Sequence, residues 1–189
     1  MMRSLVVEPQ ADAEAAAEWA TAEERSAAAA FVSARRAREF LAWRAVVRRR
    51  LGRDAAIGYD AAGAPVVTNR EGVHLSVAHA AGHIAVLFAD APCGVDIESA
   101  ARDFSRVAQR CLTPDERALS SSPLWPGIAW CAKEALYKLG GRSGLDLRRD
   151  LRLERADLEA GELTGRIGGG EPVRLAVRCH EELIVVHTL

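Results

Sequence analysis

Residues 128–141 read Ile-Ala-Trp-Cys-Ala-Lys-Glu-Ala-Leu-Tyr-Lys-Leu-Gly-Gly, follow prolines at 123 and 126, and predict a helix from about Ile128 to Leu139. At 100° per residue, one side is apolar and must face a core; it carries Ile128, Ala132, Ala135, Leu136 and Leu139. The opposite side mixes charges with aromatic rings and carries Trp130, Lys133, Glu134, Tyr137 and Lys138. Two interpretations stay open: a functional face, or a surface ion pair between Glu134 and Lys138 with the rings packed under a loop.

Upstream of this helix, Gly94-Val95-Asp96-Ile97-Glu98 predicts a strand. Side chains alternate along a strand, so Val95 and Ile97 face the core while Asp96 and Glu98 share the other face. Two carboxylates on one face repel each other unless a positive charge lies between them. Oxygen ligands of this kind suit a hard cation such as Mg²⁺, and the alternative is a solvated strand face.

Residues 12–51 are rich in alanine and free of Gly and Pro, which predicts a helical region, as two helices meeting near Thr21 or Ser33. In its later part Arg44 and Arg48 project into the apolar face, whereas the charges expected on the far side are Arg35, Arg38 and Arg49. A guanidinium directed at a core needs an anionic partner, either a carboxylate or a phosphate, unless its head reaches water.

A hydroxyl and an imidazole stand near the end of a predicted strand in Leu75-Ser76-Val77-Ala78-His79. This strand, from Val73 to Ala78, is followed by a turn at Ala81-Gly82 and by a second strand from Ile84 to Ala89. Ser76 and His79 are candidate phosphate ligands, and structural roles are the alternative.

The remaining pattern predicts short strands at residues 4–7, near Ile57 and at 66–67, and helices over residues 104–111 and from the capping box at Thr113. Strands and hairpins follow Leu145. The order of elements predicts an α+β protein of two similar halves, each with a helix packed on a small antiparallel sheet. We expect an N-terminal half over residues 1–99 and a C-terminal half over residues 100–189, packed as one globular unit.

Composition excludes several classes of protein. The chain has 189 residues, a formal net charge of −1 and 49% hydrophobic residues, typical of a globular protein rather than a disordered one. Balanced charge gives no reason to expect binding to nucleic acid, and no apolar run is long enough to cross a membrane. Four cysteines without a Cys-x-x-Cys pair, and no apparent secretory signal, predict a cytoplasmic protein. Of 25 basic residues, only Lys133 and Lys138 are lysines.

Three segments in this order resemble the motif series of the 4′-phosphopantetheinyl transferases; they are Ser76-Val77-Ala78-His79, Gly94-Val95-Asp96-Ile97-Glu98 and Trp130-Cys131-Ala132-Lys133-Glu134-Ala135-Leu136-Tyr137-Lys138-Leu139-Gly140. Gly63-Ala64-Pro65 is similar to a Gly-Lys-Pro segment of the family. The resemblance implies the family's pseudo-dimeric fold, and the length favours its larger, monomeric type. It also implies an enzyme that moves phosphopantetheine from coenzyme A to a serine of an apo acyl or peptidyl carrier protein, releasing 3′,5′-ADP.

The resemblance also implies roles for individual residues. Asp96, Glu98 and Glu134 match the acidic residues that hold Mg²⁺, with Mn²⁺ as an alternative metal. As catalytic residues it implies Asp96, Glu134, which also matches the general base for the carrier serine, and Lys138, which neutralises phosphate charge. The implied coenzyme A-binding residues are Arg44, Arg48, Ser76, His79, Lys133 and Lys138.

Two functions of other classes compete with transfer. A non-catalytic module of the same fold could bind coenzyme A or a carrier protein; the unbroken set of Asp96, Glu98, Glu134 and Lys138 argues against it. An arginine-rich helix over residues 35–53 could bind RNA, and the near-zero net charge argues against that function.

Overall fold

The computed structural model describes residues 3–180 and 182–189, and the chain divides into two compact units, Met1–Ala91 and Pro92–Leu189. The boundary between the units thus lies between Ala91 and Pro92, whereas the sequence predicted it between residues 99 and 100. The reason is that strand β6 (Val95–Ser99) pairs with β10 (Leu183–Thr188), which is the last strand in the sequence of the second unit. No helix among the described residues is long and apolar enough to cross a membrane.

The first unit contains a three-stranded antiparallel sheet in the order β1-β5-β4. Its strands are β1 (Ser4–Pro9), β4 (His74–Ala80) and β5 (His83–Ala89). β4 and β5 form a hairpin whose two turn residues, Ala81 and Gly82, both have positive φ, as a tight primed turn requires. A second, two-stranded sheet pairs β2 (Ile57–Tyr59) with β3 (Pro65–Val67).

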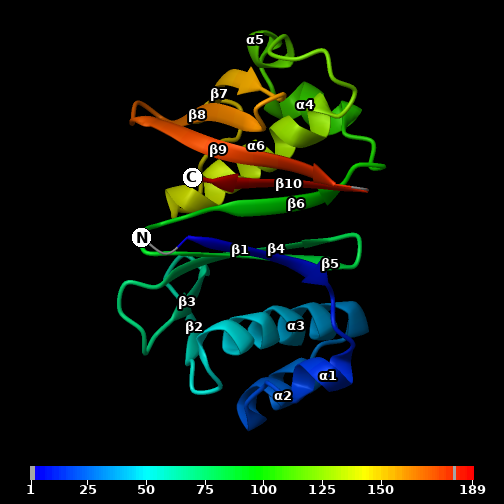
Figure 1. Cartoon of the computed structure of the whole chain (residues 1–189), viewed down its shortest axis with the longest axis vertical. Helices are drawn as coiled ribbons and strands as arrows, with labels where there is room; N and C mark the ends of the chain where they lie inside the picture. The colour runs from blue at the N-terminus through cyan, green and yellow to red at the C-terminus, as the bar shows by residue number, and fades with distance from the viewer. Residues whose placement is uncertain (1–2, 181) are drawn as a thin grey trace. The chain divides into compact units, whose positions relative to one another are not determined.

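Three helices form where the sequence predicts a helical region, because it is interrupted at both suggested points. They are α1 (Ala13–Ala17), α2 (Ala22–Ala29) and α3 (Ala34–Leu51). Thr21 and Ser33 are the N-caps of α2 and α3, and each side chain accepts a hydrogen bond from a backbone N–H of the first turn. Helix α3 contacts β5, and α1 and α2 contact α3 (Figure 1).

The second unit contains a five-stranded antiparallel sheet in the order β6-β10-β9-β8-β7. Its remaining strands are β7 (Leu151–Asp157), β8 (Glu162–Ile167) and β9 (Pro172–His180). Helix α6 (Trp125–Gly140) contacts β6, β10, β7 and β8 and buries the predicted apolar side, including Ile128, Ala135 and Leu136 (Figure 1).

The start of α6 differs from the prediction, whereas its end does not. Pro126 lies inside the first turn, where the missing N–H costs no hydrogen bond, so the helix begins at Trp125 rather than near Ile128. Gly141 ends it in the left-handed conformation, with φ 59°. Two short helices precede it, α4 (Ser105–Cys111) and α5 (Pro114–Arg117), the second beginning at the predicted Thr113 capping box.

Both units follow one plan, which agrees with the predicted α+β class of two similar halves. In the larger sheet of each unit the first strand pairs with the last strand, and the last strand pairs with the one before it. The longest helix of each unit, α3 or α6, comes between the first strand and the last hairpin in the chain. Each unit therefore presents a helix packed on a small antiparallel sheet.

Candidate active site

The site of the second unit is built where α6 passes very close to β6. A side chain at Gly94 would place its Cβ 1.9 Å from the carbonyl oxygen of Ala135, so only glycine admits the helix at this distance. The Gly94 N–H donates to Thr188 Oγ1 over 3.1 Å, and the Gly94 carbonyl accepts from the Thr188 N–H over 2.9 Å. The start of β6 is thereby fixed between α6 and β10.

Asp96 and Lys138 form the centre of this contact. Lys138 Nζ donates to Asp96 Oδ1 and to the carbonyl oxygen of Val95, each over 2.8 Å. Asp96 is 8% exposed and is buried together with its neighbours Val95 and Ile97, so burial does not distinguish the two faces of the strand at this point. Lys138 thus forms its ion pair with Asp96 of β6 rather than with Glu134, which lies one turn away on the same helix.

Glu98 is held by two neighbours that the sequence did not assign to it. The Trp130 indole N–H donates to Glu98 Oε1 over 3.1 Å, and the Arg102 guanidinium forms an ion pair with the same carboxylate. Burial raises the pKa of Glu98, Arg102 lowers it, and Asp96 raises it further, with a net upward shift. The signal for Arg102 in the sequence is its position four residues after Glu98.

Glu134 lies on α6 within electrostatic range of both strand carboxylates. Burial is the largest cause of its raised pKa, and Asp96 and Glu98 add to the shift while Lys138 opposes it. A carboxyl group whose pKa is raised in this way holds a proton more readily than an exposed one, a property suited to general-base and general-acid chemistry.

The carboxylates of Asp96, Glu98 and Glu134 are ligands of the type that a divalent cation prefers, but their side chains are not arranged around a common point in this structure. Within residues 3–180 and 182–189, no three His, Cys, Asp or Glu side chains are grouped closely enough to hold a metal. Asp96 is engaged by Lys138 and Glu98 by Arg102. The donor set consists of carboxylate oxygens, and the charge of Asp96 helps to raise the pKa of both Glu98 and Glu134; a hard cation such as Mg²⁺ stabilises a set of this kind.

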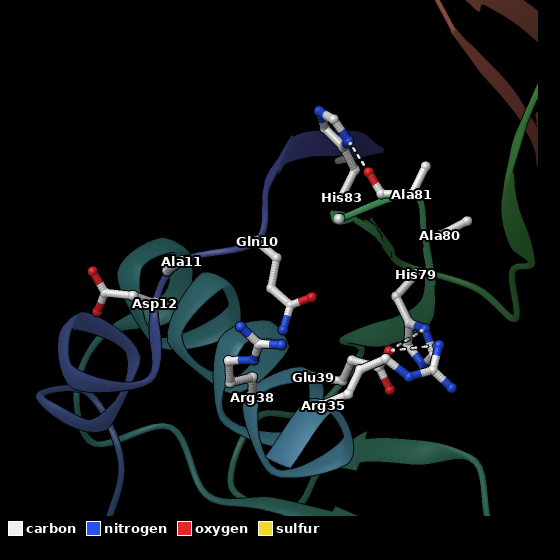
Figure 2. A pocket seen from close by; sticks show the side chains of 11 residues that line it. Gln10, Ala11, Asp12, Arg35, Arg38, Glu39, His79, Ala80, Ala81 and His83 are labelled. Carbon is white, nitrogen blue, oxygen red and sulfur yellow. Dashed lines mark hydrogen bonds and ion pairs between the residues drawn. The ribbon is translucent and has the colours of Figure 1, made fainter. Parts of the chain in front are cut away.

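The first unit contains a pocket of about 350 Å³ at the end of the β4–β5 hairpin and beside α3, and its lining includes two arginines, two histidines and two carboxylates. Figure 2 shows Arg35, Arg38 and Glu39 of α3 and His79 of β4 among its lining residues. Glu39 lies 3.6 Å from Arg35 and 3.5 Å from His79 Nδ1, and Asp12 also lines the pocket, so two carboxylates accompany its two arginines. The predicted site residue His79 is 45% exposed by side chain, whereas Ser76 is buried in β4.

Arg35 and Arg38 are residues that the sequence placed on the solvent side of the helix without a function. Their signal was the spacing of residues 35, 38 and 39, which puts them on one face of α3.

Comparison with known proteins bears on the second unit. Residues 92–183 match the family model of the 4′-phosphopantetheinyl transferase superfamily. This part of the chain belongs to that superfamily. None of the curated proteins matches the chain. The matched segment contains Asp96, Glu98, Glu134 and Lys138, which are the predicted metal-binding and catalytic residues.

Lys133, the other lysine of the transferase motif, lies elsewhere than predicted. The expectation that it shares the polar face of α6 with Glu134 is wrong, because its side chain is fully buried at 0% exposure. Its ammonium group contacts Glu116 and the carbonyl oxygens of Cys111, Leu147 and Leu151. The implied contact with coenzyme A phosphates gains no support from this position.

The guanidinium groups of Arg44 and Arg48 both contact a carboxylate of the protein, that of Glu24. Arg44 Nε lies 3.3 Å from Glu24 Oε1, and Arg48 donates to both oxygens of Glu24 over 2.6 and 2.9 Å. Arg44 also lies over the rings of Phe40 and Trp43, 3.5 and 4.2 Å from their centroids. Of the partners considered for these guanidiniums, the structure therefore shows a carboxylate; a phosphate contact stays a prediction.

Proposed function

We propose that this protein transfers the 4′-phosphopantetheine group of coenzyme A to a serine of an apo acyl or peptidyl carrier protein, with release of 3′,5′-ADP. The observation that carries the proposal is the cluster of Asp96, Glu98, Glu134 and Lys138 on β6 and α6, inside the segment that matches the transferase superfamily. Phosphoryl transfer requires charge neutralisation and positioning more than covalent help, and this cluster can supply both.

In the proposed reaction Glu134 accepts the proton of the carrier serine hydroxyl. The serine oxygen then bonds to the phosphorus that bears the pantetheine arm, and the bond from this phosphorus to the bridging oxygen of the pyrophosphate breaks, so that 3′,5′-ADP leaves. Lys138 neutralises the charge that develops on the phosphates. Asp96, Glu98 and Glu134 would hold Mg²⁺ or Mn²⁺, which when bound neutralises pyrophosphate charge.

The pocket of the first unit is our candidate for the 3′-phosphate of coenzyme A. Arg35, Arg38 and His79 line it and offer charged or hydrogen-bonding donors to an anion. We keep Ser76 among the proposed contacts of the phosphates. Dephospho-coenzyme A lacks the 3′-phosphate, so a weaker affinity for it than for coenzyme A would support this assignment.

The test is intact-mass spectrometry of several apo carrier proteins incubated with this protein, coenzyme A and Mg²⁺. We expect one phosphopantetheine to be added to at least one carrier, and no addition with EDTA or with Glu134→Ala. If no carrier gains mass while coenzyme A still binds, the non-catalytic module described above is the better description. The set of carriers modified would assign the pathway.

A further inference from the structure

Lys133 is a buried ammonium group surrounded on several sides by oxygen atoms. Its Nζ lies 2.8 Å from the carbonyl oxygens of Cys111, Leu147 and Leu151. It also lies 2.8 and 2.9 Å from the two oxygens of Glu116, a residue that is 3% exposed. An ammonium group is costly to bury unless its donors are satisfied, and here three N–H donors meet more acceptors than they need.

These contacts join four separate segments of the second unit to one point on α6. Cys111 ends α4, Glu116 belongs to α5, Leu147 lies in the loop that follows α6, and Leu151 begins β7. Glu116 extends the connection, because its carboxylate also accepts from the backbone N–H groups of Thr113 and Leu153. Its carbonyl oxygen accepts from the indole N–H of Trp125 at the start of α6.

The choice of lysine fits this enclosure. The chain uses arginine at every other basic position except Lys138. A guanidinium is a planar fork that suits flat, two-pronged partners, whereas an ammonium group directs three donors outward from one point. Oxygens that converge on one atom from three carbonyls and a carboxylate therefore match lysine and leave no plane for arginine.

We propose that Lys133 is a positioning residue: its contacts fix the rotation and height of α6, so that Glu134 next to it and Lys138 are presented to β6. The catalytic part of this inference rests on the proposed transferase function. Lys138 Nζ lies 2.8 Å from Asp96 Oδ1, and a Cβ atom at Gly94 would lie only 1.9 Å from the Ala135 carbonyl oxygen of α6. A small rotation of the helix would thus break the ion pair or force the two backbones apart.

The test compares Lys133→Met, which keeps the length of the side chain and removes the charge, with Leu163→Ala in β8. Leu163 is a buried core residue without a polar contact in the site, and its truncation lowers stability through a cavity. Thermal unfolding, coenzyme A affinity by calorimetry, kcat and KM for transfer, and backbone hydrogen exchange are measured for each variant well below its Tm.

We expect Lys133→Met to lower kcat at least tenfold, with the KM for coenzyme A changed less than threefold. Hydrogen exchange should become faster in α6, α5 and residues 147–153. Leu163→Ala should keep kcat within threefold of the wild type at a comparable loss of Tm. Lys133→Arg should not restore kcat, since a planar fork does not fit the enclosure.

Three results would overturn the proposal. A tenfold rise in the KM for coenzyme A with kcat retained would make Lys133 a phosphate ligand. A loss of kcat no larger than that of Leu163→Ala would leave it a purely structural residue. If Lys133→Met does not fold, Glu116→Gln provides the same comparison with one partner weakened. If the wild type transfers nothing, the function proposed above fails, and unchanged hydrogen exchange in α6 would separately refute the positioning role.

Discussion

Replacing Gly94 by alanine tests how closely α6 must approach β6. The new Cβ would lie 1.9 Å from the carbonyl oxygen of Ala135 and 2.8 Å from its carbon, both backbone atoms that no rotamer change can move. An ordinary contact begins near 3.4 Å, so helix and strand would have to separate by about 1.5 Å. Overpacking of this kind costs about 1–3 kcal/mol, and we expect the upper part of that range.

For a chain of this length, such a loss lowers Tm by about 5–10 °C. The same separation would open the 2.8 Å contact between Lys138 and Asp96, and a displacement of about 1 Å in a catalytic group costs roughly 100-fold in rate. Calorimetry gives the first quantity. Intact-mass kinetics on a carrier protein gives the second.

The matched control is Gly127→Ala on α6. Its Cβ would meet side-chain atoms rather than backbone, Ile184 Cδ1 at 2.8 Å and Phe104 Cε2 at 2.9 Å, and these two buried side chains would have to repack. Alanine also gains about 1 kcal/mol of helix propensity over glycine. We expect a smaller loss of Tm than in Gly94→Ala and little change in turnover, because the contact between Lys138 and Asp96 is not displaced. Wild-type Tm and turnover in Gly94→Ala would refute the view that the site depends on this close backbone contact.

Three further predictions concern single side chains. Burial raises the pKa of Glu24, but hydrogen bonds and charges from Arg48, Thr21 and Arg44 outweigh this effect, and the net shift of the pKa is downward. The ionised carboxylate therefore stabilises the fold fully above its unfolded pKa near 4.5. This contribution is lost as the pH falls through the lower pKa of the folded state. Glu24→Gln should cost about 3 kcal/mol at pH 7 and flatten the acid side of a Tm–pH curve, and an unchanged curve would contradict this. Glu134→Gln removes a charge from a half-buried site among carboxylates, so transfer should fall at least about 100-fold while Tm stays level or rises; a lower Tm with activity retained would count against the proposed role. Arg38→Ala should raise the KM for coenzyme A about tenfold and leave the KM for dephospho-coenzyme A unchanged, whereas equal effects on both would remove Arg38 from the 3′-phosphate site.

The sequence predicted those parts of the fold that local chemistry decides. Thr21, Ser33 and Thr113 have capping side chains, and each of them begins a helix in the structure. The glycine end of α6 was predicted for the same reason. The start of α6 was misplaced because proline is read as a helix breaker, although in the first turn it is tolerated.

What could not be predicted depends on partners distant in the chain. A helical projection gives the direction of Lys133 but not the carbonyl oxygens of residues 111, 147 and 151 that surround it, so a charged residue was placed on the wrong face. Arg44 and Arg48 were recognised as anomalous, yet Glu24, their common partner, lies 20 and 24 positions away, and nothing local indicates it. Pairing of buried charges is a tertiary property.

The position of β10 has a consequence for synthesis of the chain. Chains are made from the N-terminus, and domains generally fold as units when their residues have emerged. The sheet of the first unit is complete when β5 has been made, but β10 lies between β6 and β9 and follows every other element of the second unit. Until residues 183–188 have been translated, β6 lacks the strand with which it pairs, so Asp96 and Glu98 have no fixed place. Premature termination or C-terminal proteolysis that removes β10 would therefore yield a product without an assembled acidic cluster, rather than a partly active enzyme.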